Sequence, residues 1–334
     1  MNEQNLETAV EPIPIAYKDR STGLMIFGIL TILLGCLAGL FVLLMLVQVV
    51  ASRAGQVPAT SASAILPAVT IYVGLAVGLI WLGIGSCMAR RWARALLLIF
   101  SWCWLVIGLL VVVFMAFFIP KILANLPASG TAGQPAMPPA ALGAVMVILF
   151  LVFSVIFVVM PAIWTFFYHS RHVKATCEAR DPLTRWTDAC PLPVLAFSLW
   201  LMFSVLMILL MPVVGHGVMP FFGTFVSGLP GTLVCLAVAA VWSYAAWLLY
   251  QLDVRGWWLI MIALVVFLAS SLLTYARHDV LEMYHLMGYP EAQIEQIQKT
   301  GLLTGNRMIL LMLFSFLPFL GFLCFIKKYL HGKS

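Results

Sequence analysis

The sequence predicts an all-α, polytopic membrane helix bundle with about eight transmembrane helices. Three observations lead to this prediction. Hydrophobic residues make up 63% of the 334-residue chain and charged residues only 9%, whereas a soluble protein is about a quarter charged. The mean hydropathy is +1.08, so lipid rather than water must solvate most of the surface. Eight apolar stretches are each long enough to cross about 30 Å of hydrocarbon as a helix.

The chain begins with a polar segment, residues 1–21, which we expect to be a cytoplasmic tail. The first apolar run is much longer than the core of a cleavable signal peptide, so none is predicted. Helices are expected because apolar runs of this length lack the alternation of a barrel strand. The predicted spans lie at about residues 22–50, 63–88, 95–119, 141–168, 192–214, 230–251, 257–276 and 308–326.

Two four-helix halves, residues 22–168 and 192–334, flank a polar hinge loop at residues 169–191. A short basic turn at Arg90 joins spans two and three, and another at Arg255 joins spans six and seven. With an even number of helices in each half, this pattern would be a parallel repeat about an axis along the membrane normal. Coincidence is the alternative, because Trp and basic residues both favour membrane interfaces. The sequence leaves both interpretations open.

Lysine and arginine are unevenly distributed between the two sets of loops. Thirteen lie on one side and five on the other, and the positive-inside rule then places both termini in the cytoplasm, as in a bacterial inner (plasma) membrane protein. The basic side carries Lys18, Arg20, Arg90, Arg91, Arg94, Arg171, Lys174, Arg180, Arg185, Arg255, Lys327, Lys328 and Lys333. The other side carries Arg53, Lys121, Arg277, Lys299 and Arg307.

The predicted spans contain no Asp, Glu, Lys, Arg or His. Such groups are costly at membrane depth and mark proton relays, voltage sensors and ion-coupled carriers. Their absence argues against a proton-coupled transporter, a retinal protein and a bundle that binds haem through histidines. Neutral polar side chains such as Ser270, Ser271 and Thr274 are expected to bond to their own helix backbone. The seven cysteines avoid the external loops, so no disulfide framework is predicted.

Small residues, prolines and turn residues predict further features of the helices. The steps 35–39 and 74–78 each place glycine at both ends, which allows close helix contacts inside the bundle. Pro161 would kink its helix or mark its end. Residues 120–140 form a connector rich in Pro, Ala and Gly. Segments 279–287 and 290–299 suit short helices that lie on the outer leaflet, near residues 278–300.

A candidate metal site lies at the outer face. His278, Glu282 and His285 fall at i, i+4 and i+7, so on one helix all three would face the same way. With His216 from the preceding outer loop, they offer ligands for zinc or another divalent metal ion. The alternative is a solvated helix face. The order differs from His-Glu-x-x-His, in which the glutamate serves as a general base.

The hinge loop offers a second set of potential metal ligands: His169, His172, Cys177 and Cys190. Their spacing matches no standard zinc ribbon or finger, and the basic residues of the loop are already explained by orientation. No Walker sequence or Gly-x-Gly-x-x-Gly motif occurs, so no nucleotide site is predicted.

The cluster Arg90, Arg91 and Arg94 is a candidate contact for anionic lipid headgroups. Its alternative is a charge that only sets topology. The strings Arg90-Arg91-Trp92-Ala93-Arg94, Cys177-Glu-Ala-Arg-Asp-Pro182 and Cys190-Pro-Leu-Pro193 are similar to strings in uncharacterised multi-spanning bacterial membrane proteins. The resemblance covers two short hinges and implies no activity, cofactor or site.

Three functions remain from the sequence. The leading one is a non-enzymatic integral membrane protein, an accessory or lipid- or partner-binding subunit, whose partners are membrane lipid and other membrane subunits rather than nucleic acid. The first alternative is a permease or lipid-handling transporter for a neutral or apolar solute, because rocking of two halves is a common transport scheme. The second is an outer-face metal-dependent enzyme built on His216, His278, Glu282 and His285.

Overall fold

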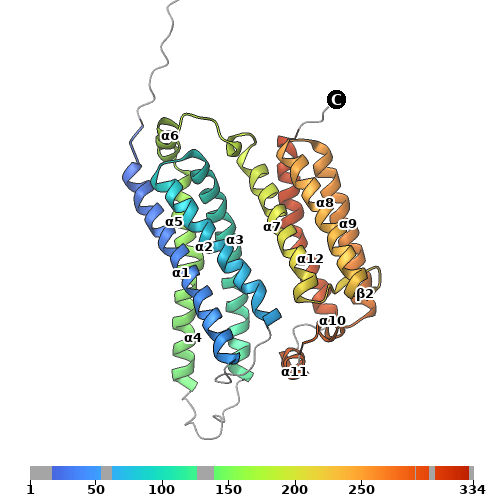
Figure 1. Ribbon diagram of the computed structural model, residues 1–334. Helices are drawn as coiled ribbons and strands as arrows, with labels where there is room; N and C mark the ends of the chain where they lie inside the picture. The colour runs from blue at the N-terminus through green and yellow to red at the C-terminus, as the bar shows by residue number, and fades with distance from the viewer. Residues whose placement is uncertain (1–16, 54–61, 126–138, 290, 301–304, 331–334) are drawn as a thin grey trace, which may run out of the picture. The chain divides into compact units, whose positions relative to one another are not determined.

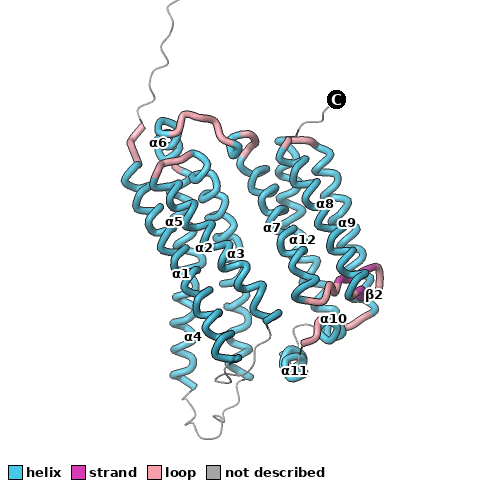
Figure 2. The backbone as a smooth tube through the Cα atoms, viewed as in Figure 1, coloured by secondary structure: helices cyan, strands magenta, loops and turns pink. Residues whose placement is uncertain are grey.

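A computed structural model of the chain describes residues 17–53, 62–125, 139–289, 291–300 and 305–330. In this part of the chain eight helices are long and apolar enough to cross a membrane, and the only sheet there has two strands (Figures 1 and 2). The predicted all-α polytopic membrane bundle is confirmed. Residues 1–16 of the predicted tail and 126–138 of the predicted connector lie outside the described residues.

The elements follow the order of the predicted spans. The first half of the chain contains α1 (Ser21–Arg53), α2 (Ala62–Cys87), α3 (Arg91–Asn125), α4 (Pro139–Ser154), the π-helical turn η1 (Val155–Val159), α5 (Met160–His169) and α6 (Arg171–Arg180). The second contains η2 (Trp186–Asp188), α7 (Leu192–Val214), β1 (Met219–Phe221), β2 (Thr224–Val226), α8 (Gly228–Tyr250), α9 (Val254–Arg277), α10 (Val280–Leu286), α11 (Glu291–Thr300), α12 (Gly305–Ile326) and η3 (Lys327–Tyr329).

Among the described residues, three short α-helices lie outside the long spans, and two of them were predicted. Helices α10 and α11 confirm the short helices predicted at 279–287 and 290–299. The hinge loop, in contrast, is not a loop throughout, because α6 occupies its first half. Val173, Thr176 and Cys177 are the buried side chains of α6, and this i, i+3, i+4 spacing is what one helical face presents to a core.

The contacts divide the chain into two compact units, which are described separately. Unit 1 consists of Met1–Thr31 and Leu82–Leu183, and unit 2 of Ile32–Trp81 and Thr184–Ser334. Unit 1 thus contains the start of α1, the end of α2 and all of α3, α4, η1, α5 and α6. Its helix ends gather at one side, where α1 and α3 begin and α2 and α5 end; we call this side the basic end.

Tyr168 of α5 connects three helices just inside the basic end of unit 1. Its side chain is 0% exposed, and its hydroxyl lies 2.7 Å from Ser86 Oγ of α2. Ser86 Oγ in turn donates to the Leu24 carbonyl of α1 at 3.0 Å. Phe27 of α1 stacks on Phe167 with a centroid distance of 4.1 Å. A buried polar chain and an aromatic cluster therefore fix α1, α2 and α5 together.

A helix irregularity lies farther along unit 1, where η1 separates α4 from α5. Pro161 has no N–H for the carbonyl four residues before it, and its ring pushes that carbonyl aside. The displaced carbonyl belongs to Phe157, in the middle of η1. It meets Gly108 of α3 so closely that a Cβ atom at position 108 would overlap the Phe157 oxygen. A π-helical turn that needs a glycine opposite it thus precedes Pro161, which lies in the first turn of α5; a kink of the helix stays a prediction.

The core of unit 2 joins α7, α8, α9 and α12. Trp257 of α9 is its largest side chain, and its Nε1–H donates to the Leu323 carbonyl at 2.8 Å. Lys327 Nζ lies 4.4 Å from the centroid of the Trp257 ring, within the range of a cation–π contact. The buried cluster comprises Val194, Phe197, Leu201, Ala245, Ala246, Leu249, Trp257, Ile260, Leu264, Leu323 and Ile326.

Glycines of α1 and α2 in unit 2 behave in two ways. A Cβ atom on Gly35 would lie 2.8 Å from Ile80 and 3.0 Å from the Ala76 carbonyl, so the predicted close contact is confirmed there. Cβ atoms on Gly74 and Gly78 would meet nothing within 4 Å among the described residues of unit 2. The prediction that the 74–78 step packs inside the bundle is therefore not supported.

Candidate functional site

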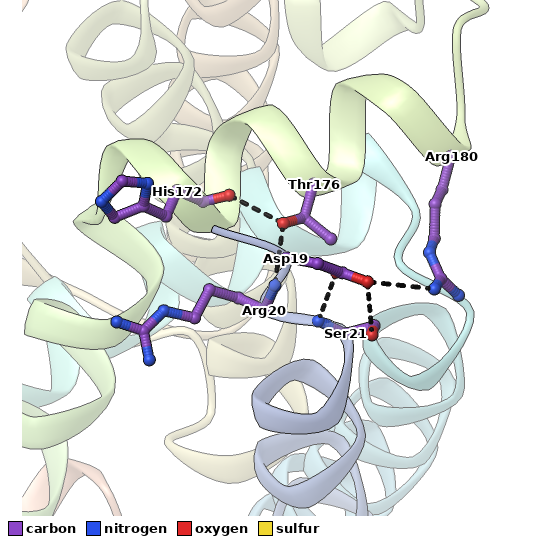
Figure 3. A network of polar contacts seen from close by, with 6 residues as sticks. All are labelled: Asp19, Arg20, Ser21, His172, Thr176 and Arg180. Atoms are coloured by element: carbon purple, nitrogen blue, oxygen red, sulfur yellow. Dashed lines mark hydrogen bonds and ion pairs between the residues drawn. The ribbon is translucent and has the colours of Figure 1, made fainter. Parts of the chain in front are cut away.

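At the basic end of unit 1, helix α6 lies along the segment that leads into α1 (Figure 3). The Lys18 N–H donates to His172 Nδ1 at 3.3 Å, and the Arg20 N–H donates to Thr176 Oγ1 at 3.1 Å. Thr176 Oγ1 donates to the His172 carbonyl at 2.8 Å. Because Nδ1 of His172 accepts a hydrogen bond, its neutral ring carries the proton on Nε2. Two polar side chains of α6 thus satisfy backbone donors that precede the first span.

Asp19 starts α1 and also reaches the far end of α6. Its Oδ1 accepts from the Ser21 N–H at 2.9 Å, and its Oδ2 accepts from the Ser21 hydroxyl at 3.0 Å. Arg180 Nη2 lies 3.6 Å from Asp19 Oδ2. The backbone bond from Ser21 is the main reason that the pKa of Asp19 is lowered, with the Ser21 hydroxyl next and Arg180 contributing less. Asp19 is therefore an anion with its partners in place.

Two of the three arginines predicted to contact lipid headgroups have acidic partners, one on α6 and one at its C-cap. Arg90 Nη1 lies 3.7 Å from Asp181 Oδ1, and Arg91 Nη2 lies 3.6 Å from Glu178 Oε1. The Arg91 N–H also donates to Asp181 Oδ2 at 3.4 Å, at the first residue of α3. A carboxylate in this position is favourable, because the start of a helix carries partial positive charge. Headgroup binding by Arg90, Arg91 and Arg94 stays a prediction, and it competes with these ion pairs.

The two thiols of the hinge region are buried and protonated. Cys177 is 1% exposed, and burial raises its pKa to about 11, against a smaller opposing effect of Arg94. Burial likewise raises the pKa of Cys190 to about 11. A thiolate is the form that binds zinc or attacks a substrate. The predicted set His169, His172, Cys177 and Cys190 remains a prediction, but neither thiol is prepared for that role.

Replacing Asp181 with asparagine is expected to release the end of α6 from α3. Asp181 is 2% exposed and its partner Arg90 is 36% exposed, so weakening this half-buried, charged contact is expected to cost about 1–2 kcal/mol. In a variant whose only cysteine is Cys177, we expect maleimide labelling at pH 8 to rise at least roughly tenfold, because an exposed thiol regains its ordinary pKa, lower by about two units. In the protein that keeps Asp181, the labelling rate of Cys177 should continue to rise with pH up to about pH 11.

The matched control for this labelling experiment is Lys174→Gln on the exposed face of α6. Lys174 Nζ lies 3.8 Å from Glu178 Oε1 in a surface pair, and such pairs contribute little to stability. Equal labelling rates in Asp181→Asn and Lys174→Gln would show that Asp181 does not hold α6 in place.

A β-hairpin connects α7 to α8 in unit 2, and the sequence did not predict it. Strands β1 and β2 pair with Phe221 opposite Thr224, and the turn residues Phe222 and Gly223 have φ of 42° and 96°, as a type I′ turn requires. The Phe222 N–H donates to Ser270 Oγ at 2.9 Å, and the Gly223 N–H to Thr274 Oγ1 at 3.0 Å. Two buried hydroxyls of α9 therefore hold the turn.

The expectation that hydroxyls in the spans bond to their own helix is partly confirmed. Thr274 Oγ1 donates to the Ser270 carbonyl at 2.9 Å, and Ser204 and Ser243 bond in the same way. The expectation is wrong for Ser270, whose hydroxyl lies 3.2 Å from the Pro220 carbonyl of β1. No sequence pattern distinguished Ser270, since its partner lies 50 residues away.

The predicted outer-face metal ligands form one pair, and the others lie next to different residues. His278 Nδ1 lies 2.8 Å from Glu282 Oε2, but His285 Nδ1 lies 3.4 Å from Glu291 Oε1 of α11. His278 precedes α10, whose N-cap is Asp279, so the premise that all three lie on one helical face is wrong. His216, with φ of 51°, lies next to Gly288.

Within the described ranges, no group of three or more His, Cys, Asp or Glu side chains is arranged to hold a metal ion. The four-residue metal site therefore remains a prediction of which the structure assembles one pair, His278 with Glu282. Comparison of the chain with family models, with curated proteins and with solved structures found no match. The site must accordingly be interpreted from its own geometry.

Proposed function

We propose that the protein is a non-enzymatic membrane protein that acts by binding, as an accessory subunit whose partner is membrane lipid or another membrane protein. The supporting observation is where its ionisable groups lie. Within the eight described spans, Lys, Arg and His occur only in the first or last four residues, and Asp and Glu do not occur. Proton relays and acid–base chemistry at membrane depth need such groups, whereas binding does not.

The orientation belongs to the same proposal. The basic end of unit 1 gathers the start of α1, the α2–α3 turn and α6, and the sequence places all their basic residues on the cytoplasmic side. Cytoplasmic termini in a bacterial inner membrane fit this arrangement. Reporter fusions after Arg20, after Arg180 and after Gly223 test it: the first two should be cytoplasmic and the third external. The opposite pattern would reverse the orientation.

The binding role is tested by extracting the protein into polymer-bounded lipid discs and weighing the intact particles by native mass spectrometry. A second protein in fixed stoichiometry, or a fixed number of retained lipids that survives mild detergent, is the expected result. A lone, lipid-free protein that catalyses turnover of a substrate would contradict the proposal.

A second function has one specific feature in its favour. Many secondary transporters place their substrate sites at discontinuous helices, and η1 is a π-helical irregularity inside the span Gly143–His169. We propose transport of a neutral or apolar solute as the alternative. Solute uptake into proteoliposomes that falls in Pro161→Ala, while the protein stays folded, would favour it over the accessory role.

A further inference from the structure

We propose that Lys18, Arg20, Arg171 and His172 form a surface that binds the headgroup phosphate of an anionic phospholipid. We call these four residues the cationic surface. The inference rests on the proposed binding function and deepens it, because it names the ligand and moves the contact from the Arg90 cluster to the first turn of α6 and the start of α1. Three observations support it: charge balance, the direction of the side chains and their level in the membrane.

The charge balance at the basic end leaves part of the positive charge uncompensated. Eight lysines and arginines lie there against three acids, and each acid already has a partner. Asp19 pairs with Arg180, Glu178 with Arg91 and Lys174, and Asp181 with Arg90. Lys18, Arg20 and Arg171 are exposed, and no ion pair to an acid is formed by them within the described residues. Among the described residues of the basic end no acid is left to pair with them, and the phosphate of an anionic lipid would supply the counter-charge.

The side chains at the start of α1 point in two directions (Figure 3). Arg180 and Ser21 surround the Asp19 carboxylate on one side. The Arg20 side chain extends away from that carboxylate, toward the same side as the His172 ring. Since Nδ1 of His172 already accepts from the Lys18 N–H, its Nε2–H is the donor that remains for a ligand. A guanidinium and an imidazole N–H suit phosphate oxygens.

The depth of these residues in the membrane favours a lipid ligand over a dissolved phosphate ion. Arg20 directly precedes the span that starts at Ser21, and Arg171 follows the span that ends at His169 by two residues. Their side chains therefore lie where headgroups lie. Below them on α5, Phe166 is 79% exposed and Ile163 is 48% exposed, so acyl chains have apolar side chains to contact.

The test compares two double variants that remove the same charge. Arg20→Gln with Arg171→Gln removes two cations of the cationic surface, and Lys174→Gln with Arg180→Gln removes two that already pair with acids. Binding of phosphatidylglycerol and of phosphatidylcholine to the purified full-length protein in detergent is measured by native mass spectrometry, and inorganic phosphate is added as competitor. Thermal unfolding of each variant confirms that it is folded.

We expect the wild-type protein to prefer phosphatidylglycerol. The Arg20 and Arg171 variant should lose roughly 20-fold in affinity for it, since one basic residue near an anionic surface contributes about fivefold, and the paired-cation control less than about threefold. Equal losses of affinity in the two double variants would show that general electrostatic attraction binds the lipid, and would overturn the proposed site. If millimolar inorganic phosphate competed for the site as strongly as added lipid does, the surface would be a site for free anions. That result would also overturn the proposed lipid site.

Failure of this inference is distinguishable from failure of the proposed function. A wild-type protein without lipid preference that still retains a stoichiometric protein partner would remove the lipid site and leave the accessory role. Loss of both lipid and partner, with turnover of a substrate, would remove both.

Discussion

Replacing Gly108 with alanine is expected to lower the free energy of unfolding by about 3 kcal/mol, the upper part of the range for overpacking a core. The new Cβ atom would overlap the Phe157 carbonyl oxygen of η1. That oxygen is part of the backbone, so it cannot move aside as a flexible side chain would. The measurement is unfolding of the purified protein by heat or by a denaturing detergent.

Two further variants make this expectation specific. Gly143→Ala in α4 is the matched control, because a Cβ atom there meets nothing within 4 Å among the described residues, and alanine favours a helix over glycine by about 1 kcal/mol. Pro161→Ala should rescue Gly108→Ala, because an N–H at position 161 draws the Phe157 carbonyl back into an α-helical bond. Gly108→Ala that is as stable as Gly143→Ala would contradict the close contact.

Replacing Trp257 with alanine is expected to cost about 4 kcal/mol, as for other buried aromatic side chains. The change removes the ring from the unit 2 core and deletes the Nε1–H bond to the Leu323 carbonyl. It also leaves Lys327 with the more distant Trp258 ring, 5.4 Å away, for a cation–π contact. Connections between α9 and α12 should weaken most. Unfolding of the full-length protein measures the loss.

The neighbouring Trp258 supplies the control for Trp257. It has the same side chain but is 52% exposed, so Trp258→Ala should cost less than about 1 kcal/mol, as for surface substitutions. Trp257→Phe should lie between the two, because it keeps most of the ring and loses the hydrogen bond to Leu323. Similar losses for Trp257→Ala and Trp258→Ala would mean that burial of Trp257 does not stabilise unit 2.

Hydrophobic length made the eight spans predictable, since about 20 apolar residues have few alternatives to a membrane helix. It did not reveal α6, because the many charged residues of Arg171–Arg180 were explained only by their role in setting the orientation of the protein in the membrane. The spacing of Val173, Thr176 and Cys177 was the available signal. Asp181 was not predictable as a partner of Arg90, since they lie 91 residues apart and only folding brings them together.

The candidate metal site shows the opposite limit of sequence patterns. Spacing placed His278, Glu282 and His285 on one helix, and it did find the His278–Glu282 pair. It could not show that Asp279 would accept the Leu281 N–H at 3.3 Å and start the helix after His278. One capping residue was enough to separate the ligands, because a helix fixes side-chain direction only within its own bounds.

The hairpin turn held by Ser270 and Thr274 has a consequence for the bilayer itself. The polar backbone of the turn lies beside α9 as far down as Ser270. In a helix that runs to Arg277, only residues 256–269, between Arg255 and Ser270, form an uninterrupted apolar length. At 1.5 Å per residue this is about 21 Å, against about 30 Å for an average hydrocarbon core. Such hydrophobic mismatch is relieved when lipid tails compress locally. The protein should therefore thin the leaflet beside the hairpin and favour membranes made of shorter chains.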